Sequence, residues 1–142
     1  MKKFANLIPL SALMLMLLIM SGCSTPEPAS LTDQQVTSLT ENILKALDAN
    51  DYENFTRDFS DKMIAAFTPD QVTGLQALID NASGKFVSVG TSSLTNNQGY
   101  AMYRFPCKYE NETVYVTITF LIDGQKVEGL FFDSANLRKS AQ

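Results

Sequence analysis

The chain has 142 residues, with 11 basic and 15 acidic side chains and no histidine. This length and a hydrophobic content of 45% suit one globular domain with a short extra segment. The net charge of −4 argues against binding to nucleic acids and to anionic lipid headgroups. Because histidine is the commonest general base and metal ligand, its absence leads us to expect no metal and no cofactor.

The chain begins with the three-part pattern of an export signal. Lys2 and Lys3 precede an apolar run over residues 4–20, and small residues follow it. Met20-Ser21-Gly22-Cys23 resembles the lipobox of prokaryotic lipoproteins, in which a cysteine thiolate takes up a diacylglyceryl group. A plain transmembrane anchor and an ordinary secretory signal are the alternatives. We therefore predict a lipoprotein signal peptide over residues 1–22 and lipid attachment at Cys23.

The predicted mature chain starts with a tether. Residues 23–30 hold small polar residues and prolines, which cannot build a packed core and favour an extended linker. Loss of the two N-terminal lysines leaves 9 basic and 15 acidic residues, a net charge of −6. We expect an extracytoplasmic protein held by its lipid at the cell membrane or cell envelope.

Helix signals fill the next fifty residues. Thr32 and Gln35 form a capping box for an amphipathic helix that should end near Ala49-Asn50. Asn50 and Glu53 suggest a second box, for a short helix with Tyr52, Phe55 and Phe59. Two further starts follow, at Ser60 and at Thr68-Pro69-Asp70-Gln71, and the last of these helices should run to about Asp80.

The second half has the texture of β-strands. We predict strands over residues 85–95, 100–109, 112–122 and 126–133, with turns at residues 96–99 and 123–124. The third strand alternates most clearly, since valine, isoleucine and phenylalanine take one face, and tyrosine and threonine take the other. Helices followed by antiparallel strands predict an α+β fold, with N-terminal helices packed on one face of a curved four-stranded antiparallel sheet.

Three segments carry a resemblance to a known family. They are "LDANDYENFTRDFSDKM" at residues 47–63, "SGKFVSVG" at residues 83–90 and "VTITFLIDGQKVEGLFF" at residues 116–132. In these segments the chain resembles the cone-shaped nuclear transport factor 2-like superfamily, and more closely a prokaryotic family of uncharacterised domains found on lipoproteins. The resemblance implies such a domain over residues 31–135, followed by a polar tail at residues 136–142. The superfamily includes enzymes, ligand binders and dimerising scaffolds, so it implies no single activity.

One carboxylate is a candidate for chemistry. Asp58 lies between Phe55 and Phe59 in sequence, and an apolar setting raises the pKa of a carboxyl. Together with Tyr103 it is our candidate pocket pair, as an acid or base within the cone. The competing and favoured interpretation is a solvated Asp58 paired with Arg57 or Lys62.

The half-polar face of the third strand is a candidate contact surface. Tyr115, Thr117 and Thr119 lie on it, and flat sheet faces with aromatic residues favour contact with partners. The strand propensity of threonine is the simpler explanation. Cys107 is expected to be a small buried hydrophobe or a half-buried free thiol. Asn54, Asn81 and Asn111 begin glycosylation sequons, which matter only in a host that modifies them.

These features predict a lipid-anchored binding or interaction module with no catalytic role. Its partner would be a small apolar ligand in the cone, a second copy of the chain, or an envelope protein. The alternative is a small isomerase or dehydratase that uses Asp58 with Tyr103 or Tyr115.

Overall fold

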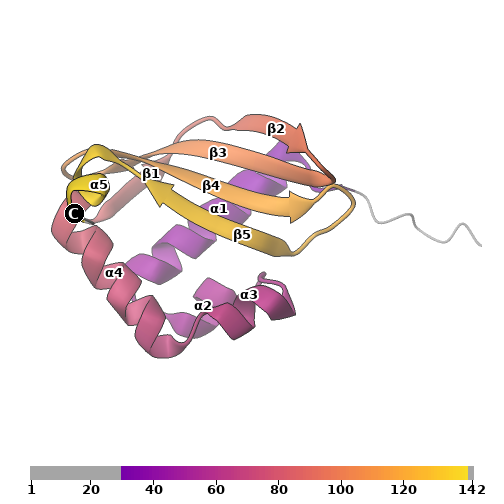
Figure 1. The fold of residues 1–142 in the computed structure, drawn as a ribbon. Coiled ribbons are helices and arrows are strands. Elements are labelled where there is room, and N and C mark those ends of the chain that lie inside the picture. The colour runs from indigo at the N-terminus through magenta and orange to yellow at the C-terminus, as the bar shows by residue number, and fades with distance from the viewer. Residues whose placement is uncertain (1–29, 141–142) are drawn as a thin grey trace, which may run out of the picture.

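A computed structural model describes residues 30–140 of the chain. Within this range, helices come first and pack against one face of a curved antiparallel sheet (Figure 1). The predicted α+β class is therefore confirmed. The elements are α1 (Asp33–Asp48), α2 (Tyr52–Thr56), α3 (Asp61–Ala66), α4 (Pro69–Ser83), β1 (Phe86–Val89), β2 (Ser93–Asn97), β3 (Tyr100–Tyr109), β4 (Thr113–Leu121), β5 (Val127–Asp133) and α5 (Ala135–Ser140).

Two capping boxes fix the starts of the long helices, as predicted. At α1 the Gln35 amide donates to Thr32 Oγ1 at 3.3 Å, and the Thr32 amide donates to Gln35 Oε1 at 2.9 Å. Thr68 and Gln71 repeat this pattern at α4, with Pro69 at the first helical position. Each box satisfies amide groups that have no partner within the helix, so both starts are encoded locally.

The predicted cap of the second helix is wrong by one residue. Asp51, rather than Asn50, is the N-cap of α2, and its carboxylate accepts from the Asn54 amide at 3.1 Å. Asn50 takes the left-handed conformation with φ of 54°, which asparagine tolerates better than most residues. Phe59, expected on this helix, lies beyond its end and forms an isolated parallel bridge to Val127 of β5.

The sheet has five strands rather than the four predicted. Its order is β1-β3-β4-β5, and β2 pairs with the other end of β3, all antiparallel. The strand expected over residues 85–95 is broken at Gly90, where a Cβ atom would lie 2.6 Å from the Pro106 carbonyl oxygen. The Gly90 amide donates to this carbonyl at 2.9 Å, but Pro106 has no amide hydrogen to return a bond, and the pairing of β1 with β3 ends here.

The core lies between the helices and the inner face of the sheet. The apolar side of β4, predicted from its alternation, is buried there: Val114, Val116, Ile118 and Phe120. Opposite them, Val36, Ile43, Leu44 and Leu47 of α1 are also buried. Burial of large apolar side chains on both sides supplies the main driving force for the fold.

The C-terminal residues form a helix, and the prediction of a polar tail is wrong there. Ala135–Ser140 form α5, and Leu137 packs against the core. The hydroxyl of Ser134 accepts from the Leu137 amide at 3.1 Å and caps this short helix. Domain contacts therefore extend beyond the expected boundary at residue 135, to at least Leu137.

Candidate functional site

An apolar groove opens between α4, β5 and α5. Its volume is about 420 Å³. The apolar side chains that line it are Phe67, Leu75, Leu78, Ile79, Leu130, Phe131, Phe132 and Leu137, and Asp133 and Arg138 complete the lining. Concave, mainly apolar hollows of this size are typical of small-molecule sites. We call this feature the α4–β5 groove.

Local sequence patterns build each wall of the groove. On α4, Leu75, Leu78 and Ile79 follow helical spacing and so share one side of the helix. Ile79 is buried, whereas Leu78 stays 45% exposed at the groove. The opposite wall comes from β5, whose apolar residues occupy both faces of the strand, and Phe131 is 63% exposed.

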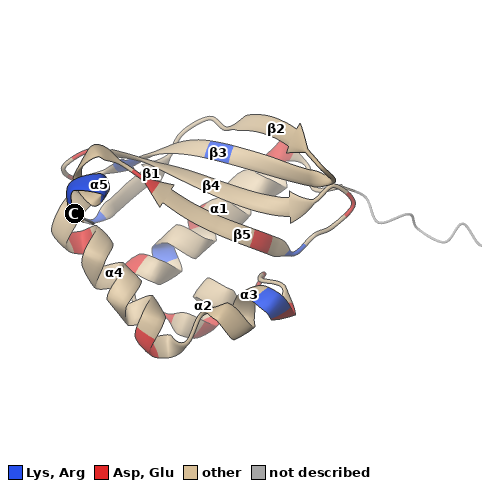
Figure 2. Cartoon of the chain, in the orientation of Figure 1, with Lys and Arg blue, Asp and Glu red and all other residues tan. Residues whose placement is uncertain are grey.

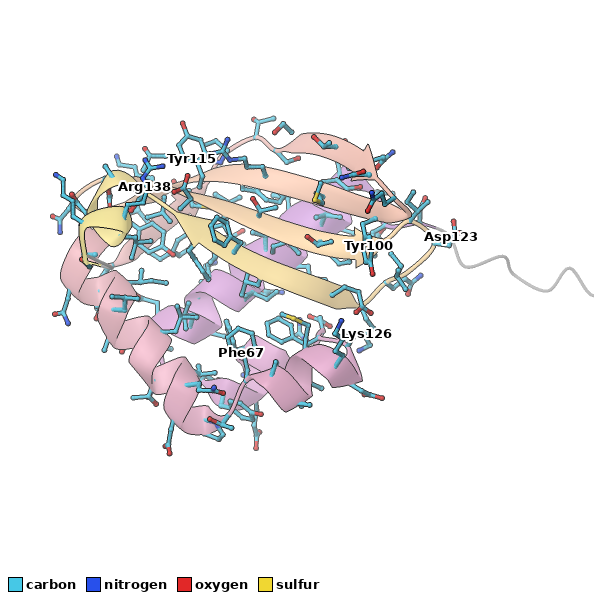
Figure 3. The ribbon with its side chains drawn as sticks, viewed as in Figure 1. Phe67, Tyr100, Tyr115, Asp123, Lys126 and Arg138 are labelled. Atoms are coloured by element: carbon cyan, nitrogen blue, oxygen red, sulfur yellow. The ribbon has the colours of Figure 1, made fainter. Side chains whose placement is uncertain are left out.

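A cluster of phenylalanine rings fills the space beside the groove. Phe55 and Phe59 lie with ring centroids 5.0 Å apart, and Phe67 lies 5.7 Å from the first and 5.9 Å from the second. The Tyr52 hydroxyl donates to the Phe67 carbonyl oxygen at 2.9 Å and fixes the loop before α4. Phe67 points from this loop toward the sheet (Figure 3). The groove is therefore an apolar recess with a packed aromatic wall.

Two charged residues form the rim of the groove, and they pair with each other. Arg138 Nη1 lies 3.1 Å from Asp133 Oδ1. Asp133 also lies 3.6 Å from Arg104 Nη2 on the outer side of the sheet. Both carboxylate oxygens of Asp133 thus face arginines, so this acid already has two charged partners.

A polar cluster that the sequence did not predict holds α5 beside the groove. Glu112 Oε1 accepts from the Ser83 hydroxyl at 2.6 Å and from the Ser134 hydroxyl at 2.7 Å. Its second oxygen accepts from the Asn136 amide at 3.2 Å. Burial opposes ionisation of Glu112, but these three hydrogen bonds and the charge of Lys139 outweigh it and lower its pKa. Residues far apart in sequence make this cluster, which explains why spacing gave no sign of it.

The candidate pair Asp58 and Tyr103 lies outside the lining of the α4–β5 groove. Asp58 Oδ2 accepts from Arg57 Nη2 at 2.7 Å, in agreement with the solvated, paired interpretation. Tyr103 packs its ring against Phe120, and burial, followed by the nearby charge of Asp33, raises the pKa of its phenol. Asp58 thus contacts Arg57 and Tyr103 contacts Phe120, and their use as a joint site stays a prediction.

The candidate contact face lies on the outer side of the sheet. Tyr115 is exposed there, and Thr117 and Thr119 are half-buried. The Arg104 guanidinium lies 4.1 Å from the centre of the Tyr115 ring, a cation–π arrangement. Thr117 stands between Arg104 of β3 and Phe131 of β5 in the strand register. The placement of the face matches its prediction, and partner binding there stays a prediction.

The remaining sequence candidates have clear positions or lie outside the described residues. Cys107 is buried, and burial raises the pKa of its thiol to about 12, so it is not a reactive nucleophile. Among the sequons, Asn54 donates its side-chain amide to Asp51, and Asn81 and Asn111 are exposed. Cys23 lies outside the described residues.

Two further observations concern metals and membranes. Within residues 30–140, no three side chains of the metal-binding types gather to form an ion site. None of the helices in the same range is long and apolar enough to cross a bilayer.

The chain belongs to a family described as "Protein of unknown function (DUF3887)", whose model matches residues 40–130. The match covers most of the helices and the sheet and ends within β5. No curated protein matches the chain. Among solved structures, it is similar to a candidate dehydratase of the NTF2-like family from Streptomyces avermitilis, with 13% identity and a TM-score of 0.46. That similarity covers 70% of this chain and 93% of the other, and it says nothing about activity.

Proposed function

We propose that this protein is a lipid-anchored, extracytoplasmic binding module that holds a small apolar ligand in the α4–β5 groove and has no catalytic role. The observation that carries the proposal is the apolar lining of a recess of about 420 Å³, open to solvent at Leu78 and Phe131. Exposed apolar side chains that surround a recess lose contact with water when a ligand enters, and this favours binding.

The rim suggests the form of the ligand. The charged side chains in the lining are Asp133 and Arg138, and they neutralise each other in an ion pair. A ligand with an apolar body and at most one polar end at the rim fits this arrangement. A strongly charged ligand would lose its hydration within the apolar walls without an opposite charge to offset the loss.

The alternative, a small isomerase or dehydratase, would need a titratable group at the bound substrate. Asp58 and Tyr103 are absent from the lining, and Asp133 is held by two arginines. This arrangement favours binding over catalysis. Conversion of a small molecule by the protein that stops in an Asp58→Asn variant would favour the enzyme instead.

The groove can be tested with the uncharged dye N-phenyl-1-naphthylamine, which fluoresces in apolar surroundings. We expect residues 30–142 to bind it with one site per chain. Leu78→Arg should weaken binding by about tenfold, because it introduces a charge among apolar walls. Val87→Arg is the matched control, since Val87 is 51% exposed and lies outside the groove lining. Equal affinity in both variants would contradict the proposal.

A further inference from the structure

Exposed apolar side chains also gather far from the groove, at the end of the sheet formed by two turns. They are Tyr100, Leu121 and Ile122, with exposures between 40% and 47%. Tyr100 pairs with Leu121 across β3 and β4, and the Ile122 amide donates to the Gly99 carbonyl at 3.0 Å. We call these three residues the sheet-end patch. These residues belong neither to the cluster of phenylalanine rings nor to the lining of the α4–β5 groove.

The surroundings of the patch are nearly free of charge. No charged residue occurs between Lys85 and Arg104, a stretch that includes β1, β2 and the first residues of β3. Every residue of β2 is nevertheless exposed, and its ribbon carries no charged residue in Figure 2. At the neighbouring turn, one acid (Asp123) and one base (Lys126) balance each other. In an acidic protein, β2 and the Asn96–Gly99 turn therefore form an uncharged surface of apolar, hydroxyl and amide groups, with Asp33 of α1 near Tyr103.

The described chain begins at this same end. Tyr103 lies three residues along β3 from Tyr100, and it is close enough to Asp33 for the carboxylate to affect its phenol. Asp33 is the first residue of α1, whose start lies beside the β2 end of the sheet in Figure 1. Figure 3 places Tyr100, Asp123 and Lys126 together at this end. Six residues lie between Cys23 and Ser30, so a lipid on Cys23 would lie within about 25 Å of Ser30 even with the tether fully extended.

We propose that the sheet-end patch is a docking surface for a neutral phospholipid bilayer. The inference rests on the lipid anchor of the proposed function, which would bring the membrane to this end of the domain. Leucine and isoleucine side chains enter the upper acyl region, while the Tyr100 ring lies at headgroup level, where amphipathic aromatic residues collect. The neutral amides and hydroxyls of the Asn96–Gly99 turn and β2 contact the headgroups. The opposite end of the sheet, with the α4–β5 groove near it, then faces away from the membrane.

The tether explains how three side chains suffice. Once the anchor is inserted, contact between patch and bilayer is intramolecular, so its effective concentration is high. The neutral patch also avoids repulsion between an acidic protein and the membrane, since the acidic residues of the domain lie mostly elsewhere (Figure 2). We therefore expect a preferred orientation of the anchored domain without strong binding by the isolated domain.

The absence of tryptophan from the chain allows a direct test. Tyr100→Trp introduces a single tryptophan at the patch, and Tyr115→Trp places one about 20 Å away along the same face of the sheet. Both tyrosines are 40% exposed, which makes the second variant a matched control. Each variant is produced from the full sequence, purified from the membranes of the producing cells and reconstituted in phosphatidylcholine vesicles with ordinary or brominated acyl chains, and flotation of the protein with the vesicles is checked in the same samples.

We expect brominated lipid to remove about half of the emission of Y100W and to leave that of Y115W unchanged, because only the patch reaches the interface. Leu121→Trp should behave as Y100W does and guards against a folding defect in one variant. A chain that floats with vesicles but shows no quenching in either patch variant contradicts the docking surface alone. A chain that does not float contradicts the anchor as well. Blue-shifted Y100W emission in water without lipid would show that a second copy or another segment covers the patch, and would also overturn the proposal.

Discussion

The Ser134 hydroxyl donates to the Glu112 carboxylate at 2.7 Å and so joins the cap of α5 to the turn between β3 and β4. Ser83, at the end of α4, donates to the same oxygen at 2.6 Å. One carboxylate thus holds together three elements that sequence spacing does not connect. Since Leu137 and Arg138 of α5 line the α4–β5 groove, this contact also positions one wall of the candidate site.

Glu112→Gln should lower the free energy of unfolding at pH 7 by about 2 kcal/mol, because hydrogen bonds to an ionised acceptor are stronger than those to an amide. Chemical denaturation of residues 30–142 measures the change. Glu41→Gln is the control, since Glu41 forms an exposed pair with Lys45 and should cost less than about 0.5 kcal/mol. Equal effects of the two substitutions would show that the Glu112 cluster contributes little.

The contribution of Glu112 should also depend on pH. Its pKa is lower in the folded protein than the ordinary value of 4.5, so folding favours the ionised form. The stabilisation is therefore fully present above pH 4.5 and is lost as the pH falls through the folded pKa. The stability difference between wild type and Glu112→Gln should shrink over that interval in a series of denaturation curves. A difference that grows on acidification would contradict the assignment.

Two glycines should respond to alanine in opposite directions. Gly90→Ala should destabilise the domain by about 2 kcal/mol, because the new methyl group would lie 2.6 Å from the Pro106 carbonyl oxygen. Gly74 is an exposed position within α4, and a Cβ atom there would meet no neighbour within 4 Å, so Gly74→Ala should stabilise the domain by about 1 kcal/mol. Thermal unfolding of both variants tests the close approach that divides β1 from β2. A neutral Gly90→Ala would show that the break has another cause.

Thiol counting tests the states of the two cysteines together. A Cys23 that carries lipid has no free thiol, and burial raises the pKa of Cys107 to about 12. We expect the folded protein purified from membranes to react with no equivalent of a thiol reagent at pH 8, and the denatured protein to react with one. One reactive thiol in the folded chain would contradict either the burial of Cys107 or the lipid on Cys23. Cys107→Ser distinguishes these cases, because it removes the signal only if Cys107 is its source.

The lipid itself can be followed with a radioactive fatty acid supplied to the producing cells. Wild-type protein should carry the label, and Cys23→Ser should carry none, because serine lacks the thiolate that takes up the lipid. Cys107→Ser should be labelled as wild type. Label that remains in Cys23→Ser would remove the anchor from the proposed function.

Sequence patterns correctly predicted the elements whose limits are set by residues close together in the chain. The capping boxes at Thr32 and Thr68 set the starts of α1 and α4, and the alternation along β4 identified its buried face. The N-cap of α2 is Asp51 and not Asn50. Asparagine and aspartate are equally good N-caps, so residue type alone does not distinguish these adjacent positions.

Errors occur where distant residues decide the structure. The first predicted strand breaks because Gly90 contacts Pro106, which lies sixteen positions later in the sequence. The predicted tail is a helix instead, because the Glu112 carboxylate accepts hydrogen bonds from Ser134 and Asn136 at the start of α5. The α4–β5 groove likewise combines α4, β5 and α5, so no single stretch of sequence reveals it. The Asp58–Tyr103 pair, inferred from residue type and neighbours along the chain, is separate from the groove lining and stays a prediction.

Native mass spectrometry of residues 30–142, purified gently from the producing organism, tests the central claim most directly. We expect a species heavier than the bare chain by one small apolar molecule, which is lost in the Leu78→Arg variant and retained in Val87→Arg. A bare mass for the wild-type domain, together with no binding of N-phenyl-1-naphthylamine, would contradict a ligand-binding role for the groove.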